Sequence, residues 1–91
     1  VYENIDNQQQ FDEYRGQVAP IVEAHQGLFI FRGGAVTTLE GEMPYERVVV
    51  LEFPCRANAE AWYNSPEYQH ILPLRTGAGR YQFILVDGYA G

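Results

Sequence analysis

Residues 48–54 read VVVLEFP, and this stretch decides the fold class. Valine, leucine and phenylalanine side chains favour a β-strand, and Pro54 ends it because proline cannot donate a hydrogen bond to a neighbouring strand. The apolar residues are consecutive rather than alternate, which is typical of a strand covered on both faces. The sequence therefore predicts a sheet with a packed layer on each side.

Two further stretches of strand composition lie on either side of VVVLEFP in the chain. Residues 28–31 read LFIF and residues 83–86 read FILV, so both are predicted strands. The pair Gly33–Gly34 follows the first of them, and we expect it to form a bulge or a bend, with strand composition resuming over residues 35–39. A turn that contains Pro44 then leads back into VVVLEFP.

Helical patterns separate these strands. Residues 7–26 carry apolar side chains at steps of three and four, which predicts an amphipathic helix with Asn7 at its cap and Gly27 as the left-handed residue at its end. A second helix is predicted over residues 57–63. Ser65 followed by Pro66 then restarts the chain as a short helix, with serine as the cap and proline at the first helical position.

The element order is strand, helix, strand, strand, helix, strand, because residues 1–5 (VYENI) alternate apolar with polar side chains as an end strand does. This order predicts one α+β domain over residues 1–91, with ferredoxin-like βαββαβ topology and a four-stranded antiparallel sheet. Helices cover only one face of such a sheet. Since a second copy supplies the simplest cover for the other face, we expect a homodimer joined through the sheet faces.

Composition excludes several classes of protein. Six arginines, with no lysine, stand against twelve acidic residues, and the net charge of −6 disfavours nucleic acid and anionic membranes as partners. No apolar run approaches the roughly 18 residues of a membrane-spanning helix. Cys55 is the only cysteine, and His25 and His70 lie far apart in sequence, so we expect no disulfide and no metal site. No cofactor motif or leader is present, so we expect a cytoplasmic protein without a cofactor.

Three stretches together carry a resemblance to a known family: GLFIFRGG (27–34), LEG (39–41) with VVVLEFP (48–54), and AWYNSPEY (61–68) followed by Arg75. The chain resembles the domain-of-unknown-function family 1330, small bacterial proteins of the dimeric α/β-barrel superfamily. The resemblance implies ferredoxin-like domains that pair sheet to sheet into a barrel. Family members usually carry serine where this chain has Cys55. The family has no established chemistry, and its oxygenase, isomerase and haem-degrading relatives are an analogy by fold.

Glu52 is the most unusual residue of the predicted sheet, because it interrupts an apolar strand on the same face as Val48 and Val50. A carboxylate in such a place acts as a general base or pairs with a cation. Arg32 is the expected partner when the turn lies near residue 43, whereas a bulge in the neighbouring strand would move Arg32 to the other face. Arg32 is also a candidate ligand for a carboxylate or phosphate.

The other candidate site residues follow the second helix. His70 is a candidate acid or base. Tyr68 either lines a pocket or packs in the core, and Arg75 either binds a ligand carboxylate or caps the end of the helix. We predict that Arg32, Glu52, Tyr68 and Arg75 converge at one edge of the sheet, because charged groups set among apolar strands need each other or water.

Two hypotheses about function remain open on the sequence alone. The first is a small-molecule enzyme without a cofactor, resembling an oxygenase or an isomerase, in which Glu52 and His70 are catalytic. Arg32, Tyr68 and Arg75 would then bind the ligand. The second is a non-catalytic ligand-binding or stress-related dimer. The absence of a nucleophile motif, metal cluster or nucleotide motif in the sequence leaves the two hypotheses balanced.

Overall fold

A computed structural model describes residues 1–88 of the chain. It contains four strands and three helices in this part of the chain. In chain order they are β1 (Tyr2–Ile5), α1 (Gln8–Ala24), β2 (Leu28–Arg32), β3 (Arg47–Glu52), α2 (Arg56–Asn64), α3 (Pro66–Thr76) and β4 (Gly79–Gln82).

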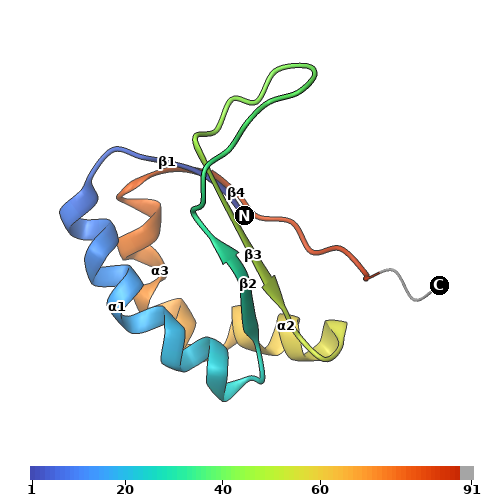
Figure 1. The fold of residues 1–91 in the computed structure, drawn as a ribbon. Coiled ribbons are helices and arrows are strands. Elements are labelled where there is room, and N and C mark those ends of the chain that lie inside the picture. The colour runs from blue at the N-terminus through green and yellow to red at the C-terminus, as the bar shows by residue number, and fades with distance from the viewer. Residues whose placement is uncertain (89–91) are drawn as a thin grey trace.

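The four strands form one open antiparallel sheet in the order β2-β3-β1-β4. This order and the three helices confirm the predicted α+β architecture, which is consistent with a ferredoxin-like fold. Helices α1 and α3 lie side by side against one face of the sheet, while α2 lies near the end at which β3 finishes (Figure 1). The second face carries no helix among residues 1–88, and we call it the open face.

Two helices begin at the predicted N-cap residues. The Asn7 side chain accepts a hydrogen bond from the backbone N–H of Gln10 at 3.1 Å, which caps α1. Ser65 Oγ accepts one from the N–H of Tyr68 at 3.2 Å, and Pro66 is the first residue of α3. Since both caps join residues three apart, they could be predicted from local sequence.

The predicted role of Gly27 is wrong. Gln26, and not Gly27, takes the left-handed conformation after α1, with φ of 64°. Gly27 is required by space instead: a Cβ atom there would lie 2.6 Å from the Phe53 ring and 2.6 Å from the Val22 side chain. The glycine therefore lets the turn between α1 and β2 approach the core.

The predicted strand over residues 35–39 does not form. Gly33 turns the chain out of the sheet with φ of 73°, and residues 33–46 project as a long loop instead of forming a bulged strand (Figure 1). The irregularity in the ladder lies earlier, between Phe29 and Phe31, so Ile30 is the extra residue. Because the Gly33–Gly34 pair lies beyond the end of β2, it forms a bend, the second of the two expected alternatives, and not a bulge.

The last strand is displaced from its predicted place. β4 covers Gly79–Gln82, and the apolar residues 83–86 continue outside any strand. The last registered pair of β1 and β4 joins Tyr2 to Gln82, so β1 offers little to pair with the residues that follow. Pairing between strands, and not apolar composition, decides where β4 ends.

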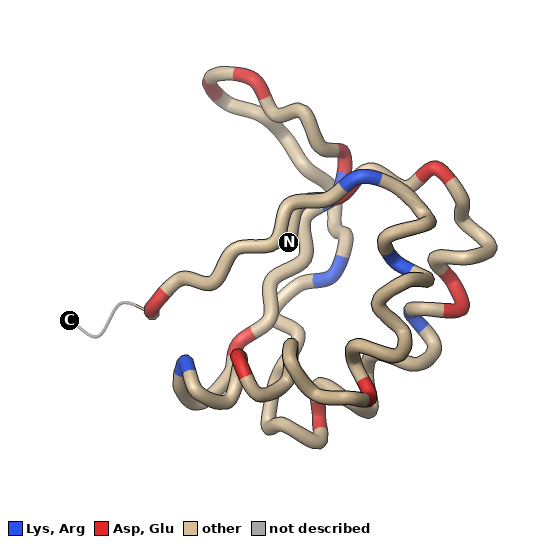
Figure 2. The backbone as a smooth tube through the Cα atoms, turned by 180° about the vertical axis from the view of Figure 1, so that it is seen from behind, with Lys and Arg blue, Asp and Glu red and all other residues tan. Residues whose placement is uncertain are grey.

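The core is aromatic and lies between the sheet and the helices. Phe11, Tyr14, Trp62 and Tyr68 are all buried in one cluster. The open face has the opposite character, since Leu28 is 62% exposed and Phe31 is 47% exposed. The acidic residues are dispersed over the projecting loop and the helices, and the arginines are scattered among them (Figure 2).

Candidate functional site

β1 begins at Tyr2, whereas β3 and residues 83–86 continue beyond that point on its two sides. A cavity of about 550 Å³ opens in the gap between them. We call it the aromatic cleft. Its lining is mainly apolar and comprises Val1, Tyr2, Val48, Val49, Val50, Leu51, Phe53, Ala59, Glu60, Trp62, Tyr63, Asn64, Phe83, Ile84, Leu85 and Val86. The volume lies within the range of roughly 300–1,000 Å³ that is usual for small-molecule pockets.

Aromatic rings make up one wall of the cleft. Trp62 is only 4% exposed, and its ring centroid lies 5.4 Å from that of Phe53 and 6.3 Å from that of Phe83. Tyr63 packs on Phe83 with 5.7 Å between the centroids. The Trp62 indole nitrogen is buried and has no hydrogen-bond partner among the described residues. The wall therefore suits a flat apolar molecule and contains one unused donor.

A group of buried polar residues lies between the sheet and helices α1 and α3. We call this group, Glu3, Tyr14, Arg47, Tyr68 and Arg75, the polar cluster. Glu3 is only 4% exposed, and its carboxylate lies 2.9 Å from Nε of Arg47 on the neighbouring strand. Burial raises the pKa of Glu3, and the positive charges of Arg47 and Arg75 partly oppose that rise.

Arg75 is the more deeply buried of the two arginines in the polar cluster, with 3% of the residue exposed. Its guanidinium carbon lies 4.3 Å from the Tyr81 ring centroid and 4.2 Å from that of Phe83. These cation–π contacts stabilise the charge only in part. Arg75 Nε is buried without a hydrogen-bond partner among residues 1–88. Since Phe83 lines the aromatic cleft, Arg75 lies directly behind its wall.

Two tyrosines complete the polar cluster. The hydroxyl oxygens of Tyr14 and Tyr68 lie 2.9 Å apart, so one hydroxyl donates a hydrogen bond to the other. Burial raises the pKa of both phenols, although the charge of Arg75 partly offsets the rise at Tyr68. Both phenols are therefore neutral near pH 7, so each hydroxyl keeps its proton and neither acts as a base.

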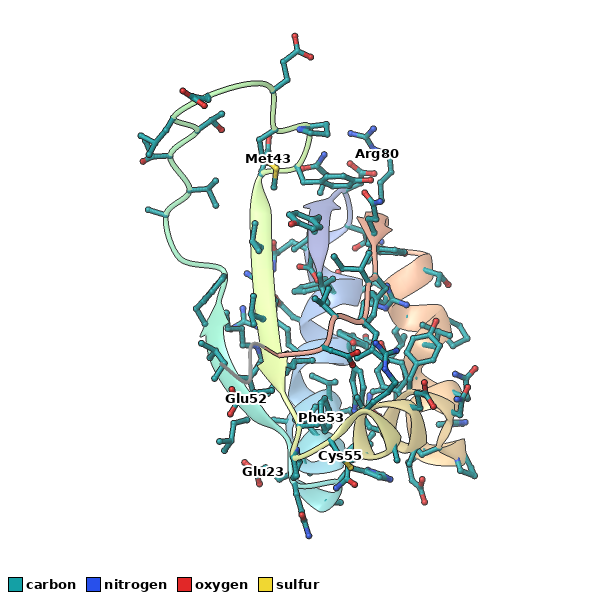
Figure 3. All side chains as sticks on the ribbon, turned by 90° about the vertical axis from the view of Figure 1, so that its right-hand side faces the viewer. Glu23, Met43, Glu52, Phe53, Cys55 and Arg80 are labelled. Carbon is teal, nitrogen blue, oxygen red and sulfur yellow. The ribbon has the colours of Figure 1, made fainter. Side chains whose placement is uncertain are left out.

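The structure does not bring Arg32 and Glu52 together. Glu52 pairs with Leu28 in the sheet and lies exposed on the open face (Figure 3). Arg32 pairs with Val49, which faces the core, and its Nη2 donates to the carbonyl of Arg15 on α1 at 3.3 Å. The extra residue Ile30 changes which β2 side chains reach each face, so the predicted contact of Arg32 and Glu52 is wrong.

The predicted four-residue convergence is therefore wrong as well, although half of it forms. Tyr68 and Arg75, both on α3, share the polar cluster, and Tyr68 is fully buried in the core. His70 lies exposed on the same helix and does not line the aromatic cleft. None of Glu52, His70 and Arg32 lines this cleft. Their predicted roles, catalytic for the first two and ligand-binding for Arg32, stay predictions.

Sequence reasoning missed Glu3, Arg47 and Tyr14. Glu3 seemed to belong to the wet face of an end strand, yet β1 lies in the middle of the sheet and turns Glu3 toward the helices. Tyr14 was expected only as part of the apolar stripe of α1. The pairing of Glu3 with Arg47 depends on the register of β1 against β3. No local pattern in the sequence records that register.

A sequence model of the family described as "Domain of unknown function (DUF1330)" matches residues 1–89. The chain belongs to this family. Among curated proteins, no sequence matches the chain. Membership is thus established over nearly the whole chain, and the description of the family assigns no reaction to it.

Two absences concern residues 1–88 only. No group of three His, Cys, Asp or Glu side chains in this range is placed to hold a metal ion. None of the helices in the same range is long and apolar enough to cross a membrane.

Proposed function

We propose that this DUF1330 protein binds a small, largely apolar organic molecule in the aromatic cleft. The observation that carries the proposal is the cleft itself, whose volume of about 550 Å³ and aromatic wall suit such a ligand. Trp62, Tyr63 and Phe83 offer the flat surfaces, and Glu60 and Asn64 lie exposed on α2 among the lining residues.

An enzyme that resembles a cofactor-independent oxygenase or isomerase is the second candidate. It is favoured by one observation, the neutral hydroxyl pair of Tyr14 and Tyr68 beside Arg75, since such donors stabilise a developing oxyanion. Both tyrosines are buried behind the cleft and do not line it. We rank binding first because Glu60 is the only described carboxylate that lines the cleft, and it is exposed. Turnover of a bound carbonyl compound, lost in Tyr68→Phe, would reverse this ranking.

We further propose that two copies pair through their open faces. Leu28 and Phe31 expose their side chains there, beside the half-buried Val48 and Val50 of β3. A second copy presents the same apolar face, so this surface is complementary to itself. The exposed free thiol of Cys55 suits a reducing compartment, which supports a cytoplasmic location.

Ligand binding is tested by titrating naphthylmethanol, an uncharged probe with an apolar body, into the protein in a calorimeter. We expect saturable binding that falls at least tenfold in Ala59→Leu, because Ala59 lines the cleft and a larger side chain fills it. Ala61→Leu is the matched control, since Ala61 is exposed on the same helix and does not line the cleft. Absence of binding, or equal loss in both variants, would refute the proposal.

Pairing of two copies is tested by size exclusion coupled to light scattering. The natural chain should run at twice its monomer mass of 10.4 kDa. Leu28→Glu should yield the monomer, because it places a charge in the proposed interface. Leu39→Glu, in the projecting loop, is the matched control and should remain dimeric. A monomeric natural chain at micromolar concentration would overturn the proposal.

A further inference from the structure

The unused polar atoms around the aromatic cleft are unevenly divided between donors and acceptors. Trp62 lines the cleft and Arg75 lies behind its wall, and each carries a buried donor, Nε1 and Nε, without a partner among the described residues. Both nitrogens are covered by neighbouring side chains, so a ligand reaches them only when a side chain of the wall moves. A buried donor without a partner loses its hydrogen bond to water, so a ligand that supplies an acceptor gains affinity. This favours a ligand with acceptor oxygens at one end.

The charges in the polar cluster also favour a ligand with acceptor oxygens. Two guanidinium groups, of Arg47 and Arg75, share the single buried carboxylate of Glu3. Arg47 holds the direct contact at 2.9 Å, whereas Arg75 forms no ion pair among residues 1–88. The cluster therefore carries at least one excess positive charge, and the Arg75 guanidinium that holds it is buried. An anion next to Arg75 would balance it.

Phe83 separates the Arg75 guanidinium from the cleft. Its ring covers the guanidinium at 4.2 Å and also packs on Trp62 and Tyr63. Phe83 follows the last residue of β4, so the strand ladder does not hold its backbone. A shift of this one side chain would open a path from the cleft to Arg75.

We infer that the ligand of the aromatic cleft is an organic carboxylic acid, with its apolar body on the aromatic wall and its carboxylate accepting from Trp62 and Arg75. This inference rests on the proposed binding function and narrows it to one chemical class. A bidentate contact with a guanidinium also explains an arginine in this position, since its planar fork matches a carboxylate. The carboxylate would approach the N–H edge of Arg75 once the Phe83 ring has moved aside.

The test compares naphthoate with naphthylmethanol, two probes of similar shape that differ in charge. We expect the natural chain to bind naphthoate at least tenfold more tightly. Arg75→Met should abolish the preference and leave the affinity for the alcohol within about twofold, while Arg80→Met, at an exposed arginine of β4, should change neither. Equal affinities in the natural chain, or a preference that survives Arg75→Met, would overturn the inference.

A second variant keeps the test decisive if Arg75→Met fails to fold. Trp62→Phe removes the indole N–H and retains an aromatic ring, so it should weaken naphthoate several-fold more than naphthylmethanol. An equal effect on both probes would contradict the proposed contact. Binding of naphthylmethanol without any preference for naphthoate refutes the carboxylate alone, whereas failure of both probes refutes the proposed function.

Discussion

The covered face and the open face of the sheet each contain residues that depart from a simple inside-outside rule, in opposite directions. Between the sheet and helices α1 and α3 lie Glu3, Arg47 and Arg75, a carboxylate and two guanidinium groups. On the open face Leu28 and Phe31 meet solvent. Charge is thus buried where packing is complete, and apolar surface is exposed where no layer covers it.

This difference indicates that the two faces have different roles. Buried polar groups are rarely retained for stability alone, because apolar residues of similar volume often stabilise a fold as well or better. An exposed apolar face costs solubility unless something covers it. We therefore associate the open face with assembly and the polar cluster of the covered face with the ligand. Val48 and Val50 of the open face also line the aromatic cleft, so the two proposed surfaces adjoin.

The largest expected effect is a difference in stability between a substitution in the buried core and one on the open face. Trp62→Ala should lower the free energy of unfolding by about 3–5 kcal/mol, because it leaves a cavity between the rings of Phe53, Tyr68 and Phe83. Leu28→Ala should cost less than about 1 kcal/mol in dilute, monomeric protein, since the side chain is already exposed. Denaturant titration measures both values, and similar losses would break the comparison.

Two glycine substitutions, one at a packed turn and one in the exposed loop, should differ in stability by a smaller amount. Gly27→Ala should destabilise the protein by about 1–3 kcal/mol, because the added Cβ would meet Phe53 and Val22 at 2.6 Å. Gly34→Ala is the matched control: nothing lies within 4 Å of its added Cβ. Thermal unfolding should therefore hardly change in the control. If both substitutions were tolerated equally, the turn before β2 would not pack on the core as described.

The smallest expected effect depends on pH. Since burial raises the pKa of Glu3 above its ordinary value of 4.5, folding favours the protonated acid. The natural chain should lose stability relative to Glu3→Gln as the pH rises from 4.5 through the raised pKa, by at most about 1.4 kcal/mol per pH unit.

Urea titrations between pH 4.5 and pH 7 check this prediction, with the exposed Glu60→Gln as control. A natural chain that gains stability over the Glu3→Gln variant as the pH rises would show that pairing with Arg47 outweighs burial.

Local sequence patterns predicted much of the fold. The stripe of α1, the Ser65–Pro66 helix start and the apolar strands β2 and β3 depend on residues close together in the chain. The candidate site was harder to predict because it depends on register. One extra residue at Ile30 sends Arg32 to α1. No periodicity revealed the middle position of β1, which buries Glu3.

The short central strand has one more consequence. The N–H of Val49 donates to the carbonyl of Val1 at 2.8 Å, and backbone groups two residues apart on a strand point to the same side. The amide of Leu51 thus faces the aromatic cleft, opposite no residue of β1. Hydrogen–deuterium exchange should accordingly be fast at Leu51 and slow at Val49, which gives an inner strand one amide with the lability of a sheet edge.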